Sequence, residues 1–373
     1  MSNVAIDIPF FKKGSLPSFS LDFLSGRPSR LAGVDIGAYS AKVVQLRYEH
    51  ERAVLETYGE LLASNYLKKE GNRGSDFLRS SDNESAELLR DLFRESNISA
   101  KDAVFSIPAS AGFITVVSFP LLSKEEIDQA MPFEARKYVP VPTAETVVDW
   151  EIIEVSEEKK STDVLLIAVP KEIVEKIKRL ASLTKIGLRA MEIEIFCLIR
   201  SLLGQDPFPT ALINIGHQAT SLAMVDRGRL RASHSFDRGS QSFTRALEQG
   251  LGISLERAEA IKKEVGLSER VEEREIASVV SPLAETLFTE IERIIVFYNR
   301  KADRKIQRAV LTGGGSNLKG MIDLASTKLG IEVARGNPFG RIVTPAFLQP
   351  TIREVGPSLS VAVGAALREI TSR

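Results

Sequence analysis

Short apolar runs separated by glycine and polar residues occupy the first part of the chain after residue 30. LAGVDIG at 31–37 and AKVVQLR at 41–47 are rich in residues that favour strands, and a glycine and small residues lie between them. This pattern predicts two strands joined by a tight turn. Residues 52–60 predict a third strand of the same kind.

The longest uncharged stretch, residues 103–122, is long enough to cross a bilayer as a helix. It contains two prolines, a glycine and several serines, which interrupt a spanning helix. The alternation of apolar and polar residues within it instead predicts two short strands, near 102–107 and 113–119. We therefore expect this stretch to belong to a folded sheet.

Helical periods and cap signals mark the elements between these strands and residue 186. Ser123 and Glu126 have the spacing of a capping box, which predicts a helix running towards Tyr138 with Pro132 inside it. Polar residues 68–85 predict a loop. The remaining elements predicted here are a helix near 86–95, strands near 147–154 and 163–169, and a helix at 171–186.

The second half of the chain repeats the order of strands followed by helices. Strands are predicted at 210–216, 219–226 and 230–236, and a helix at 254–265 begins after Ser254 and stops at Gly266. Residues 274–300 place apolar side chains at steps of three and four, which predicts a long helix with one buried face. Alternating α and β elements of this kind favour an α/β architecture.

Composition excludes several functional classes. The chain has 373 residues, enough for two or more domains, and 49 basic residues balance 49 acidic ones. A net charge of zero disfavours a protein that binds nucleic acid. One cysteine and three scattered histidines do not have the spacing of zinc ligands. The N-terminus has no basic segment followed by an apolar run, so a secretory signal peptide is not expected.

Residues 1–30 differ from the rest of the chain in composition and in hydrophobic pattern. They carry three prolines, six serines and four phenylalanines without a sustained period, which predicts a flexible N-terminal tail. A docking segment that uses Phe10, Phe11, Phe19 and Phe23 is the alternative.

An internal similarity is the most informative feature of the sequence. VDIGAYSAKVVQL at 34–46 aligns with INIGHQATSLAMV at 213–225, at an offset of 179 residues. Each copy ends a strand with an acid or amide, then has a glycine, a turn of mostly small residues and a second strand. Glycine allows backbone N–H groups to approach an anion closely, so two such hairpins facing each other would grip a polyphosphate.

A third segment, AVLTGGGSNLKGM at 309–321, predicts a strand that enters a glycine turn and then a helix. The turn at 313–316 would hold an anion or a purine sugar against the helix N-terminus. Gly315 and Gly320 have the spacing of a P-loop, but Met321 replaces the lysine that this motif requires.

Together, VDIG…K, INIG…TS and LTGGGSNLKG resemble the ATPase fold of actin, Hsp70 and the sugar kinases. AEAIKKEVG at 258–266 is similar to the adenosine-contacting helix of the bacterial actin homologues FtsA and MreB. FEARKYVPVPTAETVVDW at 133–150, NPFG at 337–340 and VAVGAALRE at 361–369 are similar to the PilM family. The chain is identified as a member of the type IV pilus assembly protein PilM family, with FtsA second.

This resemblance implies an α/β, two-lobed actin-like ATPase fold with an inserted 1C subdomain of the FtsA and PilM type. The inserted 1C subdomain is expected at 59–170, and lobe 2, containing 2A and 2B, at 206–344. Lobe 1, or 1A, would combine 31–58, 171–205 and 345–373.

The resemblance also implies ATP and Mg²⁺ as ligands. Asp35 would hold Mg²⁺ through water, and Lys42 would reach the phosphates as a point charge, although an exposed strand lysine is the alternative. Backbone N–H groups and hydroxyls would line the two hairpins, at Gly37, Ala38, Tyr39 and Ser40 in the first and Gly216, His217, Gln218 and Thr220 in the second.

The glycine turn and one helix complete the implied nucleotide site, through Gly313, Gly314, Gly315 and Ser316 and through Glu259 and Lys262. Glu259 and Lys262 lie three residues apart and would face a ribose and a base, or else form a solvated ion pair on the helix surface. Glu194 lies where relatives place a residue that orients the attacking water.

The second hairpin departs from the family pattern, because Asn214 stands where the family normally has an aspartate. An amide neither attracts Mg²⁺ as a carboxylate does nor takes up a proton. We therefore expect at most a weak ATPase, with slow or absent hydrolysis. A strand-end asparagine without a catalytic role is the alternative.

The implied function is a cytoplasmic scaffold of type IV pilus assembly that binds the N-terminal peptide of the inner-membrane protein PilN between 1A and 1C. Other pilus assembly proteins are further possible partners, and membrane contact would be indirect. An FtsA-like cell-division protein is one alternative, but no basic amphipathic helix of the FtsA kind precedes Arg373. A metabolic kinase of the sugar-kinase branch is another, which Asn214 disfavours.

Overall fold

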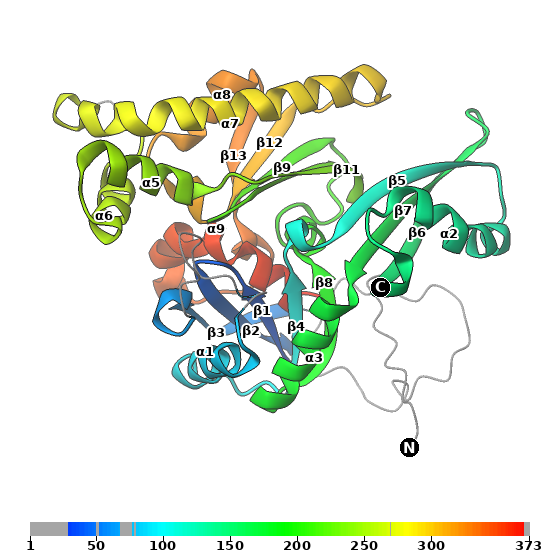
Figure 1. Cartoon of the computed structure of the whole chain (residues 1–373), viewed down its shortest axis with the longest axis horizontal. Coiled ribbons are helices and arrows are strands. Elements are labelled where there is room, and N and C mark those ends of the chain that lie inside the picture. Colours follow the sequence, from blue (N-terminus) through cyan, green and yellow to red (C-terminus); the bar gives the residue numbers. More distant parts are fainter. Residues whose placement is uncertain (1–28, 50–51, 68–76, 78–79, 269, 369–373) are drawn as a thin grey trace. The chain divides into compact units, whose positions relative to one another are not determined.

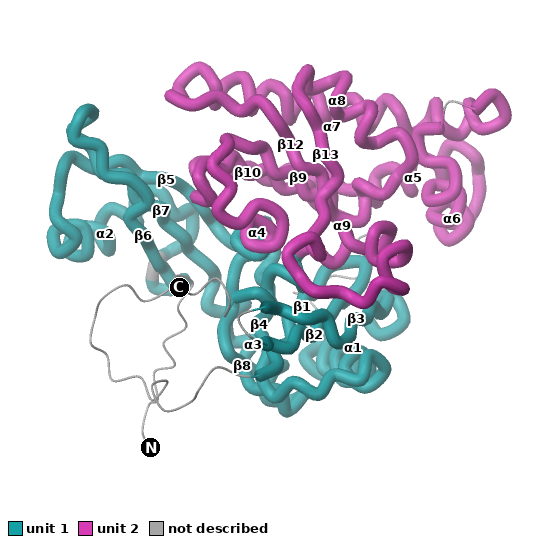
Figure 2. The backbone as a smooth tube through the Cα atoms, turned by 180° about the vertical axis from the view of Figure 1, so that it is seen from behind, with its two compact units in different colours: residues 1–197, 361–373 teal, residues 198–360 magenta. Residues whose placement is uncertain are grey.

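The computed structural model describes residues 29–49, 52–67, 77, 80–268 and 270–368. Two compact units make up the chain, residues 1–197 with 361–373 and residues 198–360, coloured separately in Figure 2. The expected N-terminal tail, 1–30, lies outside the described residues except for its last two.

The first unit contains a five-stranded sheet in the order β3-β2-β1-β4-β8. Its first three strands are antiparallel neighbours, and β1, β4 and β8 run parallel. The strands are β1 (Arg30–Ile36), β2 (Ser40–Glu49), β3 (Arg52–Leu62), β4 (Asp102–Ile107) and β8 (Gly187–Ile193). The predicted strand pair and third strand are confirmed, with β3 two residues longer than expected.

Helices cover both faces of this sheet, and two glycines allow the close approach. A side chain at Gly59 would collide with Ser96, just after α1 (Asp82–Glu95), and one at Gly33 would meet the Ala362 carbonyl of α9 (Gln349–Ala366). Gly59 pairs with Val43 and Gly33 with Val44, so the two glycines point to opposite faces. Helix α1 and the C-terminal end of α9, from Val361 on, therefore lie on opposite faces of the sheet, while α3 (Lys171–Thr184) packs beside α1.

The start of α1 differs from the sequence prediction. We expected a loop through residue 85, but Ser81 and Glu84 form a capping box and the helix begins at Asp82. The reciprocal cap satisfies N–H groups at the helix start, which contributes about 1 kcal/mol and outweighs the turn preference of these polar residues.

A separate three-stranded sheet, in the order β5-β7-β6, also belongs to the first unit. Its strands are β5 (Phe113–Pro120), β6 (Thr146–Ser156) and β7 (Ser161–Pro170). The amphipathic helix α2 (Lys124–Tyr138) packs on it through Ile127, Met131 and Ala135. The predicted capping box of Ser123 and Glu126 is present.

The block expected as an insertion, 59–170, covers two structural environments. Its helix α1 and strand β4 pack in the five-stranded sheet, where β4 pairs with β1, whereas β5, α2, β6 and β7 form the smaller layer. Strand β4 continues the parallel ladder of β1, which its alternating pattern did not reveal. The uncharged stretch 103–122 is therefore β4 and β5, and no helix in the described part of the chain is long and apolar enough to cross a membrane.

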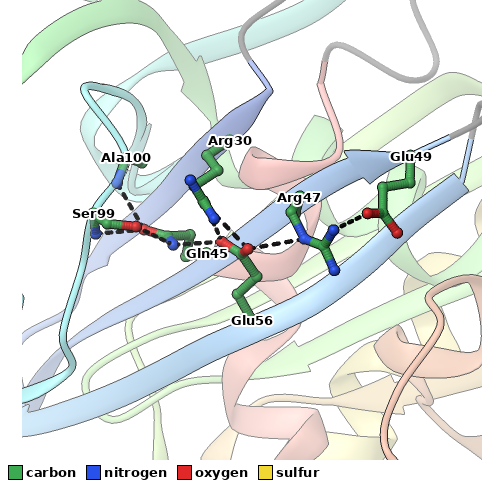
Figure 3. A network of polar contacts seen from close by, with 7 residues as sticks. All are labelled: Arg30, Gln45, Arg47, Glu49, Glu56, Ser99 and Ala100. Carbon is green, nitrogen blue, oxygen red and sulfur yellow. Dashed lines mark hydrogen bonds and ion pairs between the residues drawn. The ribbon is translucent and has the colours of Figure 1, made fainter.

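A polar network, drawn in Figure 3, secures one end of the five-stranded sheet. The buried amide of Gln45 donates to Glu56 and to the Ser99 hydroxyl, and accepts from the backbone N–H groups of Ser99 and Ala100. Arg30 and Arg47 bond to the same Glu56 carboxylate. Burial raises the pKa of Glu56, but the hydrogen bonds from Arg30 and Gln45 and the two guanidinium charges outweigh it, so the pKa lies below the ordinary value.

The second unit contains a five-stranded sheet with the same layout, in the order β11-β10-β9-β12-β13. Its strands are β9 (Thr210–Ile215), β10 (Thr220–Asp226), β11 (Arg229–Phe236), β12 (Arg308–Thr312) and β13 (Glu332–Arg335). Strands β9, β10 and β11 are again antiparallel neighbours, and β12 runs parallel to β9 and β13. This match confirms the internal repeat that the sequence predicted.

Helices of the second unit pack on this sheet (Figure 1). The long helix α7 (Arg274–Lys301) buries Val280, Leu287 and Ile291 against apolar residues of the sheet, as its periodicity predicted. Helix α6 (Leu255–Val265) is capped by Ser254 and ends at Gly266, also as predicted. Helix α5 (Ser240–Leu251) was not predicted, and α8 (Met321–Leu329) is the remaining α-helix described in this unit. The short α4 (Glu194–Leu198) follows β8 and lies almost wholly in the first unit.

Candidate functional site

The two predicted hairpin turns have matching geometry, one in each unit. In the first, the N–H of Gly37 donates to the Ser40 carbonyl at 3.0 Å, and in the second the N–H of Gly216 donates to the Ala219 carbonyl at 2.9 Å. These two N–H groups close their turns and are not directed at a ligand, which differs from the sequence expectation. Within the described residues, the N–H groups of Ala38 and Gln218 have no protein acceptor, so they remain able to bind an anion.

The hydroxyls expected to ring the phosphates point elsewhere. Ser40 is fully buried and donates to Glu60 at 2.5 Å, while Thr220 is fully buried and donates to the Arg238 carbonyl at 2.7 Å. Each hydroxyl ties its turn to a neighbouring segment. The structure therefore assigns Ser40 and Thr220 to the support of the turns, because a buried hydroxyl satisfies the nearest acceptor.

Three strand ends of the first sheet bring Asp35, Ser106 and Glu194 to one edge. Asp35 is next to last in β1, Ser106 next to last in β4, and Glu194 follows β8 directly. The carboxyl ends of parallel strands meet at the same edge of a sheet, which is the usual place for a ligand. Ser106 donates to the Asp35 carboxylate at 2.8 Å, a contact that the sequence did not suggest.

Lys42 lies directly opposite Asp35 across the β1–β2 ladder, so both side chains occupy the same face. Its ammonium lies 3.8 Å from the Glu60 carboxylate, and its side chain is mostly buried. The lysine is therefore not an exposed strand residue. Sequence reasoning missed Glu60, which contacts both Ser40 and Lys42.

The glycine turn after β12 packs closely against the end of β9. A side chain at Gly313 would lie 2.4 Å from the Asn214 Oδ1 atom, and one at Gly315 would lie 2.3 Å from the Ile215 Cγ2 atom. Gly313 also has a φ of +85°, which favours glycine. Gly314 is exposed and faces open space, so it is the glycine of this turn that a ligand could approach.

The end of this turn differs from the sequence expectation. Ser316 is buried and donates to the Gly313 carbonyl at 2.7 Å, so its hydroxyl closes the turn. A short 3-10 turn occupies Gly314–Asn317, and α8 begins only at Met321. Gly320 adopts a φ of +75°, which interrupts the backbone before the helix starts.

Glu259 and Lys262 bind each other instead of projecting from the surface of α6. The ammonium of Lys262 is 2.6 Å from the Glu259 Oε2 atom, 2.9 Å from the Thr244 hydroxyl and 3.3 Å from the Ser240 carbonyl. The side chain of Lys262 is 3% exposed and that of Glu259 is 17% exposed. The solvated surface pair that the sequence left open is therefore excluded.

Burial and pairing shift the pKa values of both groups. Burial lowers the pKa of the Lys262 ammonium, and the Glu259 carboxylate offsets only part of this effect. Burial raises the pKa of Glu259, but Lys262 and the hydrogen bond from Thr244 outweigh it, so this pKa lies below the ordinary value. The pair is an internal link between α6 and α5.

The N-terminus of α5 connects this pair to the second turn. The first N–H groups of α5, at Ser240 and Gln241, donate to the carbonyls of Gly216 and His217 at 2.9 Å each. Gly239 permits this approach, because a side chain there would lie 2.4 Å from the His217 carbonyl oxygen. The sequence DRGS at 237–240, a glycine before a serine, is a turn-to-helix signal that could have indicated α5.

The residues fit a magnesium ion only when phosphate and water provide most of its ligands. Within the described ranges, no group of three or more histidine, cysteine, aspartate or glutamate side chains could hold a metal ion. Asp35 contributes a single partly exposed carboxylate, which is the usual protein share for Mg²⁺ bound with a nucleotide.

Comparison with known families identifies the chain over nearly its whole length. A family model described as type IV pilus assembly protein PilM matches residues 33–370. The cell division protein FtsA of Enterococcus faecalis is 24% identical in an alignment of 179 residues that covers 42% of this chain and 40% of that protein. FtsA of Enterococcus hirae is 26% identical in an alignment of 192 residues that covers 45% of this chain and 43% of that protein. The chain thus matches less than half the length of these curated relatives.

Solved structures show the same fold. A PilM–PilN type IV pilus biogenesis complex contains a chain with a TM-score of 0.79 and 21% identity, with 91% of this chain and 98% of that chain covered. The ethanolamine utilization protein EutJ from Carboxydothermus hydrogenoformans has a TM-score of 0.56 and 17% identity, with 91% and 90% covered. MreB5 of Spiroplasma citri bound to AMPPNP has a TM-score of 0.50 and 12% identity, with 92% and 96% covered.

These likenesses confirm the predicted actin-like ATPase fold class. The PilM family model, which matches residues 33–370, covers residues of both units, including the two turns, the glycine turn and helix α6. The chain therefore belongs to the type IV pilus assembly protein PilM family.

Proposed function

We propose that this protein is an ATP-binding scaffold of type IV pilus assembly, held at the cytoplasmic face of the inner membrane through a protein partner. The observation that carries the proposal is the matched pair of turns at 37–40 and 216–219, in a chain whose family match spans both. Each turn has the same closing hydrogen bond and a neighbouring backbone N–H that could bind an anion.

Each turn offers backbone groups that would bind phosphate oxygens. The N–H groups of Ala38 and Gln218 have no protein acceptor among the described residues, and Gly314 faces open space. Lys42 supplies a positive charge beside Asp35 in the ladder. Tyr39, His217 and the neighbouring turn backbone complete the phosphate contacts in this proposal.

Asp35 would hold Mg²⁺ through bound water, and Glu194, on the same strand edge, would orient an attacking water. Bound Mg²⁺ neutralises phosphate charge and fixes the phosphates in place. Asp35 is partly exposed and accepts a hydrogen bond from Ser106 on one oxygen, so its other oxygen is available for the metal shell.

Helix α6 would contact the adenosine through Glu259, with Lys262 in support. The Glu259 Oε2 atom accepts from Lys262 and Thr244, whereas Oε1 forms an ion pair with the exposed ammonium of Lys263 at the longer distance of 3.5 Å. Oε1 can therefore accept a ribose hydroxyl. Lys262 keeps α6 against the N-terminus of α5, and so against the second turn.

The partner in this proposal is the N-terminal peptide of PilN, because PilN accompanies the PilM chain in the solved complex. Helix α2 and its sheet are the expected contact region. The outer face of α2 exposes Phe133, with the guanidinium of Arg136 5.7 Å from the ring centre, and Tyr138 is also exposed. An exposed aromatic beside an arginine is typical of a protein-binding surface.

Isothermal calorimetry of Asp35→Ala tests the nucleotide site. We expect Mg²⁺–ATP to bind about tenfold more weakly, since a charge-assisted contact is lost. Asp163→Ala, which removes a carboxylate from the three-stranded sheet, is the control and should bind ATP normally. Equal affinity of Asp35→Ala and the wild type would refute Asp35 as a metal-side residue.

A pull-down and titration with an N-terminal PilN peptide test the partner surface. Charge reversal by Glu134→Lys or Arg136→Glu should weaken peptide binding by about tenfold and leave ATP affinity unchanged. Lys178→Glu is a matched control, because Lys178 forms an exposed helical ion pair with Glu175 on α3. A fall in ATP affinity for the α2 variants would show that the assignment is wrong.

A further inference from the structure

A buried hydroxyl supports the carboxylate on which the proposed metal site depends. Ser106 Oγ donates to Asp35 Oδ1 at 2.8 Å, and Ser106 is 4% exposed. The parallel register of β1 and β4 pairs Val34 with Phe105, so the next residues of the two strands, Asp35 and Ser106, are neighbours. The contact follows from the sheet and does not need a flexible loop.

A hydrogen bond to one carboxylate oxygen has a directional effect on the other. An aspartate at a strand end rotates freely about two side-chain bonds unless a neighbour fixes it, and ordering it on ligand binding costs free energy. The Ser106 hydroxyl holds Oδ1 and thereby sets the direction of Oδ2 before any ligand arrives. Preorganisation of this kind strengthens binding without a new ligand contact.

We propose that Ser106 is a positioning residue that orients the Asp35 carboxylate for the hydrated Mg²⁺ of bound nucleotide. This inference rests on the proposed function, because it concerns the same site. Ser106 would touch neither the metal nor the nucleotide and would act through Asp35 alone.

The second unit provides an internal comparison. Thr312 ends β12 directly beside Asn214 of β9, which is the position that Ser106 has beside Asp35. The Thr312 hydroxyl lies 2.8 Å from the Ser360 hydroxyl and 3.1 Å from the Pro357 carbonyl oxygen, both in α9. A hydroxyl is thus present at both positions, but in the second unit it bonds to α9 and not to the strand-end amide.

The difference between the two hydroxyls follows the chemistry of their neighbours. A carboxylate is the stronger acceptor, and a hydroxyl beside it gains more by donating to it than to a carbonyl. Where the neighbour is the amide Asn214, the hydroxyl supports the helix packing of its own unit. The orienting contact therefore occurs in the unit whose turn carries the carboxylate proposed to face Mg²⁺.

The test measures nucleotide affinity with and without Mg²⁺ in the full-length protein. Calorimetry is carried out with ATP plus Mg²⁺ and with ATP plus EDTA, and electron paramagnetic resonance counts Mn²⁺ bound in the presence of ATP. For Ser106→Ala we expect about tenfold weaker binding of Mg²⁺–ATP and weaker Mn²⁺ retention, with unchanged affinity in EDTA. Ser106→Thr retains the hydroxyl and should restore the wild-type ratio.

A matched control removes a hydrogen bond of the same chemistry elsewhere in the unit. Ser118 on β5 donates to Asp163 at 2.5 Å, away from the strand edge that carries Asp35. Ser118→Ala should leave both affinities unchanged. If Ser106→Ala does not fold, Ser106→Cys keeps the volume with a weaker donor and is judged by the same ratio of affinities.

The outcomes separate this inference from the proposed function. A wild-type protein that binds no nucleotide overturns both. A wild type that binds ATP better with Mg²⁺, together with a Ser106→Ala variant that behaves identically, overturns only the role of Ser106. Equal weakening with Mg²⁺ and with EDTA, or no rescue by Ser106→Thr, shows a purely structural effect and also overturns it.

Discussion

Lys262 and Glu259 form an ion pair inside the second unit, with their charged atoms 2.6 Å apart and the lysine side chain 3% exposed. The ammonium also bonds to Thr244 and to the Ser240 carbonyl, so all three of its protons have acceptors. Ser240 is the first residue of α5, whose backbone contacts the turn at Gly216. The pair therefore connects the helix proposed to meet adenosine with the turn proposed to meet phosphate.

Removal of one partner should destabilise the second unit more than removal of both. Glu259→Gln leaves a buried ammonium without its counter-charge, and we expect a loss of about 3 kcal/mol in the free energy of unfolding. Glu259→Gln combined with Lys262→Met should lose less, because no uncompensated charge remains. Urea denaturation of both variants checks this order, and a double variant less stable than the single one would contradict it.

The same pair predicts a loss of stability in acid. The pKa of Glu259 in the folded protein lies below its ordinary value of 4.5, so the carboxylate contributes stability above pH 4.5, and this contribution is lost as the pH falls through the folded pKa. Glu259→Gln does not titrate at this position. The difference in unfolding free energy between wild type and variant should therefore shrink below pH 4.5. Denaturant titrations at a series of pH values measure this difference, and a difference that stays constant with pH would contradict the prediction.

Gln45 should make a large contribution to the stability of the first sheet. Its buried side chain satisfies two backbone N–H groups of the 99–100 loop and two side chains (Figure 3). Gln45→Ala leaves those groups unpaired, so we expect a loss of about 2 to 3 kcal/mol by chemical denaturation. Arg47→Gln removes only partly exposed ion pairs, with Glu49 and Glu56, and should cost less than about 1 kcal/mol. Equal losses in the two variants would argue against a special role for the amide.

Two glycine variants should separate packing from ligand binding. A Cβ atom at Gly33 would lie 2.0 Å from the Ala362 carbonyl oxygen of α9, so Gly33→Ala forces the helix from the sheet and should cost about 3 kcal/mol or more. A Cβ atom at Gly314 meets nothing within 4 Å. Gly314→Ala should keep the melting temperature and weaken ATP binding. Thermal melting and calorimetry on both variants check this contrast, which fails if Gly314→Ala unfolds or binds ATP normally.

Asn214 is expected to limit turnover. The amide contacts the glycine turn and is 8% exposed, but it cannot attract a metal-bound water as a carboxylate can. Loss of one such electrostatic contact typically lowers kcat by about a hundredfold, so wild-type hydrolysis should be far slower than the ~1 to 1000 per second common for enzymes. Asn214→Asp should raise single-turnover hydrolysis at least several-fold with little change in affinity. A wild-type protein that hydrolyses several ATP molecules per second would contradict this prediction.

Most elements and the repeat were determined by the sequence itself. Alternating apolar residues and cap residues act through neighbours a few positions away, so β1, β2, the capping box at Ser123 and the stop of α6 at Gly266 could all be predicted locally. The two turns at Gly37 and Gly216 were visible for the same reason, because a repeated local pattern is preserved in order along the chain.

Only the tertiary structure decided which groups those side chains contact. Ser40 bonds to Glu60, Lys262 to the first turn of α5, and Ser106 to Asp35, and each partner lies 20 to 71 positions away in the chain. The order of the strands in the sheet brings such residues together. Strand β4 pairs in parallel with β1 although β2, β3 and α1 lie between them in the chain. Local periodicity carries no information about that pairing. The sequence therefore could not show that the Ser40 and Thr220 hydroxyls support their turns, or that the Ser106 hydroxyl bonds to Asp35.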